Sequence, residues 1–209
     1  MKSSVNYENI QKSQSEARLA TYESHSKDQN AALELYRFNL QISGAFLPCL
    51  AICEVAIRNT VSNALRAVYG ENWAYNERFL RTLPKPRRQD VLKAHQSTAD
   101  IDKIIPELPF VFWQSLFTSR FDDGIWRKHL KTCFCHTEIS DLAQFRSDLH
   151  RDLEMVRKLR NRIAHHEPIF NRDLKADYER ILKIVGYCSK DTKIWLEYWQ
   201  QVTDILATK

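Results

Sequence analysis

The chemically richest segment of the sequence runs from Arg160 to Pro168 and reads Arg-Asn-Arg-Ile-Ala-His-His-Glu-Pro. Histidine is the side chain best suited to move protons near neutral pH, and arginine suits phosphate oxygens. Together they suffice for RNA cleavage without a metal: a base takes the 2′-hydroxyl proton, a cation stabilises the pentacoordinate phosphate, and an acid protonates the departing 5′-oxygen. The alternative is structural, because an isolated His165-His166 pair favourably caps a helix C-terminus.

A long helix is predicted to carry this segment. Ser140 is a suitable N-cap, the helix runs to about His165, and Pro168 stops it. Arg160 is predicted in the middle of the apolar stripe of this helix, which comprises Leu149, Leu153, Val156 and Ile163. A guanidinium among apolar side chains is costly unless it is paired or binds an anion. Arg160 is therefore either a structural arginine that bonds carboxylates or carbonyls inside the bundle, or a functional one.

The spacing of Arg160 and His165 raises a geometric difficulty. Five residues at about 100° each place the two side chains roughly 140° apart around an ideal helix. They converge if the helix unwinds near Pro168, or if two copies of the chain pack with both helix ends facing one cleft. The sequence leaves both solutions open.

A second pair of charged residues falls within an apolar helix face. Glu54 and Arg58 are four residues apart, which is the spacing of a helical ion pair. They share a broad face with Leu47, Leu50, Ile57, Val61 and Leu65. One interpretation is a buried Glu–Arg pair that fixes helix register, and the other makes Glu54 or Arg58 an orienting partner for Arg160.

The composition restricts the fold class. The 209 residues include only 4 Gly and 6 Pro, too few for the closely spaced turns of a β-sandwich or β-barrel. A hydrophobic content of 44% is too high for a disordered chain. We therefore expect an all-α protein. The net charge of +5 permits nucleic-acid binding without requiring it.

The sequence predicts one helical domain, residues 15–209, after a flexible polar lead at residues 1–14. The central helix is long, from Ala17 to about Ala67, and Pro48 either kinks it or starts a new helix. Gly70 ends it, and residues 73–85 form a loop or short turns. The remaining helices are predicted at about 86–99, in an aromatic run after Pro109, at 140–165, at 173–186 and at 191–207. No long uninterrupted apolar run and no secretory signal occur, so we expect a cytoplasmic protein that does not span a membrane.

Two further candidate sites are weaker. A basic stretch that includes Arg87 and Arg88 either follows an RNA backbone or is a solvated helix face. In Cys133-Phe134-Cys135-His136 the three possible metal ligands are spaced too closely to bind one metal ion well. No second cluster of ligands completes a tetrahedral zinc site. We therefore expect neither a bound metal nor a cofactor.

Four segments in order resemble motifs of one protein family. Leu159 to Phe170 resembles the signature of the Abi-like (abortive infection) proteins of bacteria, which belong to the HEPN superfamily and carry an Arg, a polar residue, at least three more residues and then a His. The other three segments are Leu35-Tyr36-Arg37-Phe38-Asn39, Glu54-Val55-Ala56-Ile57-Arg58-Asn59 and Leu108-Pro109-Phe110-Val111-Phe112-Trp113. The resemblance covers about residues 15–200.

The resemblance implies a HEPN-like α-helical bundle, usually dimeric, and a metal-independent endoribonuclease that acts as a toxin or phage-defence effector. Matched by position, Arg160, Asn161 and His165 are the implied catalytic residues. The auxiliary candidates are His166, Glu54 and Arg58, and the RNA-binding candidates are Arg162, Arg87 and Arg88. The expected partners are RNA, a second copy of the chain, and an antitoxin or other regulatory protein.

Two alternatives to the ribonuclease remain at this stage. One is a catalytically silent HEPN module that binds RNA, nucleotides or a protein partner. The other is a structural helical dimer in which Arg160 only ties helices together. The complete Arg-Asn-x-x-x-His set favours the ribonuclease.

Overall fold

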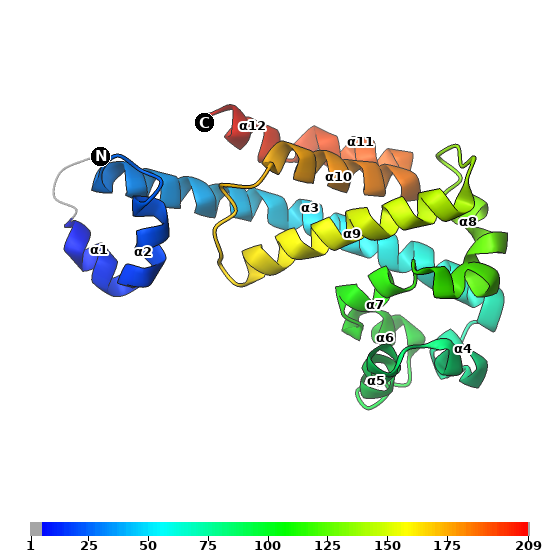
Figure 1. Cartoon of the computed structure of the whole chain (residues 1–209). Coiled ribbons are helices and arrows are strands. Elements are labelled where there is room, and N and C mark those ends of the chain that lie inside the picture. The colour runs from blue at the N-terminus through cyan, green and yellow to red at the C-terminus, as the bar shows by residue number, and fades with distance from the viewer. Residues whose placement is uncertain (1–5, 209) are drawn as a thin grey trace.

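One helix of 41 residues, α3 (Gln29–Tyr69), is the central element of the computed structural model, which describes residues 6–208 (Figure 1). The Asp28 side chain caps its N-terminus by accepting a hydrogen bond from the Ala31 N–H at 2.8 Å. Gly70, with φ +88°, ends the helix as the sequence predicts, and its N–H donates to the Arg66 carbonyl. Glycine suits this position because other residues avoid positive φ.

Pro48 does not start a new helix. The helix continues through Pro48, although proline has no N–H to donate to the carbonyl four residues earlier, at Gly44. Gly44 and Pro48 both lie on the exposed side of α3, where water can hydrate the freed carbonyl. The exposed position therefore makes an interior proline tolerable.

The N-terminal region differs from the prediction. The expected flexible lead, residues 1–14, contains helix α1 (Tyr7–Gln14), while residues 1–5 lie outside the described part of the chain. The predicted start of the long helix forms instead a separate helix, α2 (Glu16–Glu23). Two side-chain contacts explain why α1 is ordered: the Tyr7 hydroxyl donates to Glu23, and the Tyr36 hydroxyl donates to Gln14 at 3.0 Å.

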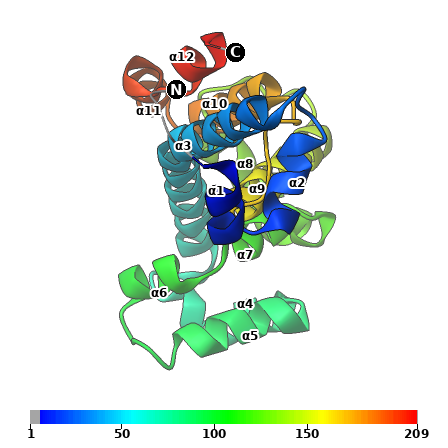
Figure 2. The same cartoon turned by 90° about the vertical axis from the view of Figure 1, so that its left-hand side faces the viewer.

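Two further helices complete the main bundle. Both α9 (Leu142–Ala164) and α10 (Leu174–Cys188) pack against α3 and against each other (Figures 1 and 2). The predicted helix at 191–207 is divided into α11 (Lys190–Trp199) and α12 (Val202–Ala207), because Gln200 adopts an extended conformation. Residues 6–208 thus form an all-α fold, as predicted, and contain no strand.

Short helices between α3 and α9 form a second group, on the right in Figure 1 and mostly below α9. The segment predicted as a loop or short turns, 73–85, contains a 3₁₀ turn and the short helix α4, and buried Trp73 and Phe79 pack together there with ring centroids 5.5 Å apart. The elements of this region are the 3₁₀ turn Trp73–Tyr75, α4 (Glu77–Thr82), α5 (Lys85–Ala94), α6 (Ile101–Glu107), α7 (Phe110–Ser115), the 3₁₀ turn Ser119–Phe121, the π-helical turn Asp122–Trp126 and α8 (Arg127–Cys133).

Within residues 6–208, α3 is also the one helix that is long and apolar enough to cross a membrane, judged by length and composition. The buried core helix of a water-soluble fold meets the same criterion. One side of α3 contributes to the core through Ile42, Phe46 and Ile57, among others, while Leu40 and Leu47 on its other side are about half exposed.

Candidate functional site

Helix α9 ends within the Arg160–Pro168 segment, in a Schellman motif. The Glu167 N–H donates to the Arg162 carbonyl at 2.7 Å, and the His166 N–H donates to the Ile163 carbonyl at 3.0 Å. His165 is the C-cap residue, and His166 follows in the left-handed region with φ +55°. A residue other than glycine in this region costs about 1 kcal/mol. The helix therefore ends through backbone bonding, and both histidine side chains are exposed.

The start of α9 differs by one residue from the prediction. The N-cap is Asp141, whose carboxylate accepts a hydrogen bond from the Gln144 N–H at 3.0 Å, and not Ser140. A carboxylate at this position also interacts favourably with the helix dipole.

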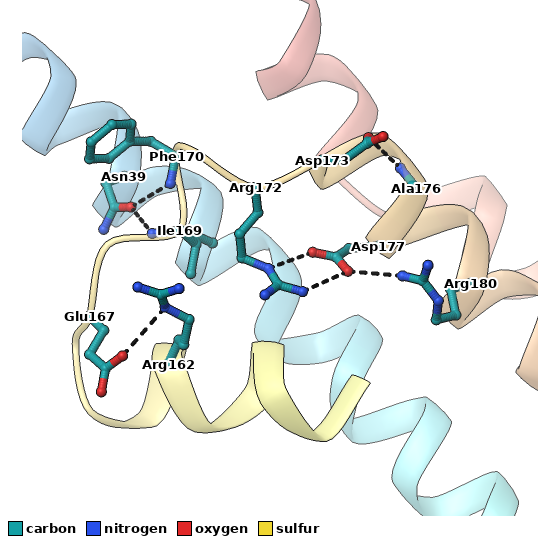
Figure 3. Close-up of polar contacts among 10 residues, drawn as sticks. All are labelled: Asn39, Arg162, Glu167, Ile169, Phe170, Arg172, Asp173, Ala176, Asp177 and Arg180. Atoms are coloured by element: carbon teal, nitrogen blue, oxygen red, sulfur yellow. Dashed lines mark hydrogen bonds and ion pairs between the residues drawn. The ribbon is translucent and has the colours of Figure 1, made fainter. Parts of the chain in front are cut away.

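Asn39 holds the loop that follows α9. Its side-chain oxygen accepts hydrogen bonds from the backbone N–H of Ile169 at 2.7 Å and of Phe170 at 3.2 Å (Figure 3). Asn39 lies on α3 and is only 2% exposed, so these two N–H groups have a buried acceptor. This contact fixes the position of the loop relative to the central helix.

Helix α2 contacts the same loop from another side. Arg18 donates from Nη1 to the His166 carbonyl at 2.6 Å. The Phe170 ring packs against Tyr22 and His25, with ring centroids 5.3 and 5.2 Å apart. The helices α1 and α2 thus lie at the end of the bundle where α9 terminates (Figures 1 and 2).

An ionic network fixes the far end of the loop. Arg172 donates to both carboxylate oxygens of Asp177, from Nε at 2.7 Å and from Nη2 at 2.9 Å, and Arg180 reaches the same carboxylate at 3.0 Å (Figure 3). Asp152 on α9 then contacts Arg180 at 3.3 Å and Lys183 at 2.8 Å. The network joins the loop to α10 and α10 to α9, so the segment carrying the histidines is held at both ends.

The placement of Arg160 contradicts the prediction. The side chain is exposed and does not lie in the middle of an apolar stripe; the neighbouring residue Leu159 is buried in its place. In Figure 1 the C-terminal end of α9 extends past α7, which packs against α9. Arg160 is therefore not a structural arginine inside the bundle, and it is accessible to an anion from solvent.

The structure excludes one of the two solutions for the geometric difficulty, the unwinding of the helix. The helix stays regular through Ala164, so it does not unwind between Arg160 and His165, and the two exposed side chains diverge within one chain. Asn161 is partly buried on the same turn, and Arg162 forms an ion pair with Glu167, with Nε and Oε2 3.4 Å apart. In one copy of the chain, the motif residues therefore lie on the same end of α9, but the Arg160 and His165 side chains point in different directions.

Glu54 and Arg58 lie elsewhere on α3. Asn39 is a residue of α3 that hydrogen-bonds to the loop, and Arg58 lies roughly 28 Å further along the helix at about 1.5 Å per residue. Within residues 6–208, no ion pair joins Glu54 to Arg58. Neither proposed role, a Glu–Arg pair or an orienting partner for Arg160, fits this placement.

The other weak candidates are also distant from the end of α9. Arg87 and Arg88 lie on α5, which is separated from that end in both views (Figures 1 and 2). Arg87 is paired with Asp90, with Nε and Oδ2 3.1 Å apart, while Arg88 is exposed. Burial raises the pKa of the Cys133 thiol to about 11, which disfavours the thiolate that binds metals.

Three positioning residues were not singled out by the sequence-based reasoning: Arg18, Asn39 and Arg172. Asn39 carried a usable signal, because it is a polar residue three positions before Ile42 and seven before Phe46 on the buried face of α3. It also ends one of the four motif segments. Arg18 and Arg172 act across the fold and carry no comparable local pattern.

Comparison with known proteins gives one finding. No curated protein and no solved structure matches the chain. A family model described as Abi-like protein matches residues 5–171, which covers most of the chain and ends within the loop that follows α9. The chain belongs to the Abi-like protein family.

Proposed function

We propose that the chain is a metal-independent endoribonuclease that acts in abortive infection, as a toxin or phage-defence effector. The observation that carries the proposal is the end of α9, where Arg160 and His165 are exposed on a backbone held by Asn39, Arg18 and Asp177. Rigid support of exposed ionisable side chains is typical of sites that perform chemistry. The family match includes this whole segment.

The proposed reaction is an internal transesterification of RNA. A histidine removes the 2′-hydroxyl proton, the 2′-oxygen bonds to the adjacent phosphorus, and the bond to the 5′-oxygen breaks. The departing oxygen takes a proton from an imidazolium, so the products are a 2′,3′-cyclic phosphate and a 5′-hydroxyl. Arg160 stabilises the charge that develops on the phosphorane oxygens, and the Asn161 amide donates a further hydrogen bond.

We propose that two copies of the chain form the complete site. One chain supplies one Arg160 and one His165 on diverging sides of α9, whereas the reaction needs a base and an acid on opposite sides of the phosphorus. A two-fold dimer that pairs the ends of α9 supplies two histidines and two arginines from one surface used twice. The exposure of Arg160 and His165 leaves this surface accessible to a second copy.

A second candidate function follows from the same geometry. Because Arg160 and His165 diverge in one chain, a monomer would bind RNA or nucleotides without cleaving them. This catalytically silent module is the alternative that the following experiments separate from the ribonuclease.

We expect the purified protein to cleave single-stranded RNA in the presence of EDTA and to leave DNA of the same sequence intact. DNA lacks the 2′-hydroxyl nucleophile, and the proposed site needs no metal. Gel electrophoresis of labelled oligonucleotides measures both. Equal cutting of DNA, or complete inhibition by EDTA, would contradict the mechanism, and binding of RNA without cleavage would favour the silent module.

We expect a dimer in solution whose specific activity falls on dilution. Light scattering gives the mass, and a dilution series of the cleavage reaction gives the activity per chain. Mixing an excess of His165→Ala protein with unmodified protein should lower the activity per unmodified chain, because a mixed dimer has lost one of the two histidines that act as base and acid. A monomer with undiminished specific activity would refute the shared site.

A further inference from the structure

A polar cleft of about 380 Å³ lies between the second half of α3 and helix α6. Arg58, Asn59, Asn63 and Arg66 line it from α3, and Asp102 lines it from α6. This volume falls within the range of small-ligand sites. The cleft is distinct from the end of α9, because Arg58 lies far along α3 from the residue that contacts the α9 loop.

Arg58 differs from the other arginines that have a buried side-chain nitrogen. In the described part of the chain, five arginines have a buried side-chain nitrogen without a hydrogen-bond partner, namely Arg58, Arg66, Arg87, Arg146 and Arg162. Four of them have a carboxylate within ion-pair distance, in the pairs Arg66–Asp102, Arg87–Asp90, Arg146–Asp122 and Arg162–Glu167. Within residues 6–208, Arg58 has none. A buried N–H of a charged group without a hydrogen-bond partner is costly, so we expect a ligand to supply an acceptor for Arg58.

The second arginine of the cleft is compensated. Arg66 reaches Asp102 with its Nη2 at 2.7 Å, and its Nε lies 3.3 Å from Glu71. The Asp102 side chain is 76% exposed at the mouth of the cleft, where it competes with any incoming anion for Arg66. One cation of the cleft is thus free and a second is held by a carboxylate that water reaches easily.

We propose that this cleft binds the phosphate group of a nucleotide or of an RNA chain, with Arg58 as its principal ligand. The planar guanidinium donates two parallel hydrogen bonds to phosphate oxygens, and these charge-assisted bonds are among the strongest in proteins. The Asn59 and Asn63 amides add donors and acceptors for the attached sugar, and Ile105 and Pro106 add apolar surface on α6. The proposal concerns binding alone and does not depend on cleavage at the end of α9.

Isothermal titration of the full chain tests the cleft with three probes: inorganic phosphate, 5′-AMP and a single-stranded RNA with 2′-O-methyl groups, which has no free 2′-hydroxyl to attack. We expect Arg58→Ala to weaken binding about tenfold or more, because a lost hydrogen bond to a charged group is typically worth that much. The matched control is Arg127→Ala, which removes the same charge from an exposed arginine outside the cleft. Its affinity should stay within about twofold of the unmodified chain.

Asp102→Asn provides a test of the opposite sign. Removing the competing carboxylate frees Arg66, so phosphate binding should become severalfold tighter. Asp102 is exposed, so this variant folds even if Arg58→Ala does not. If the substitutions change the affinity for 5′-AMP, the phosphate comes from a mononucleotide. If they change only the affinity for the RNA probe, the phosphate belongs to an RNA strand. Unchanged binding of every probe in Arg58→Ala, weaker binding in Asp102→Asn, or equal affinity for acetate would overturn the proposal.

Discussion

His165→Ala should lower RNA cleavage by about 100-fold or more, the usual contribution of a general acid or base. The free energy of unfolding should change little, because the His165 side chain is exposed and forms no contact in the core. Cleavage rates and urea unfolding curves measure the two quantities separately. The matched control is His136→Ala, which removes another exposed histidine, located just before the N-terminus of α9 and thus at the opposite end of that helix from His165, and should leave the rate unchanged.

The neighbouring histidine requires its own variant. His166 has φ +55°, so His166→Gly relieves backbone strain, and we expect equal or higher stability with cleavage largely retained. Near-normal cleavage by His165→Ala combined with loss of cleavage in His166→Gly would transfer the catalytic role to His166. Loss in neither variant would show that cleavage depends on neither histidine and would contradict the proposed site.

Asn39→Ala should lower the free energy of unfolding by about 2–4 kcal/mol, because it leaves two buried N–H groups without an acceptor. These groups belong to Ile169 and Phe170, so the loop after α9 loses its contact with α3. Cleavage should fall as well, since the position of His165 depends on that loop. Urea unfolding measures the stability, and the matched control is Asn63→Ala, an exposed asparagine on the same helix.

Two outcomes would show that Asn39 does not have this role. If Asn39→Ala unfolds within roughly 0.5 kcal/mol of the unmodified chain, the hydrogen bonds contribute little net stability. If the Asn63→Ala control is equally destabilised, the effect belongs to asparagine substitution on α3 in general and not to the loop contact.

The helical class and the position of the α9 helix end were predictable from the sequence, because both depend on local signals. Low glycine and proline content indicates helices, and Pro168 after a polar helix end indicates its termination. Gly70 likewise ends α3 as predicted. These features require no knowledge of which helices pack together.

The burial of individual side chains was harder to predict. The exposure of Arg160 depends on which elements pack against the last turns of α9, and hydrophobic periodicity along one helix does not give that information. The same reasoning applies to Glu54 and Arg58, whose i,i+4 spacing suggests an ion pair that does not form. The helix α1 was missed because its order depends on contacts with Glu23 and Tyr36, which only the folded chain brings together.

The central claim is a transesterification at the end of α9, and analysis of the product ends tests it most directly. An RNA that carries one 2′-deoxy residue at the mapped cleavage position should survive in EDTA, while the all-ribose RNA yields a 2′,3′-cyclic phosphate and a 5′-hydroxyl. Mass spectrometry of the products distinguishes these ends from all others. Cleavage of the 2′-deoxy substrate, or products that end in a 3′-hydroxyl and a 5′-phosphate, would contradict the account.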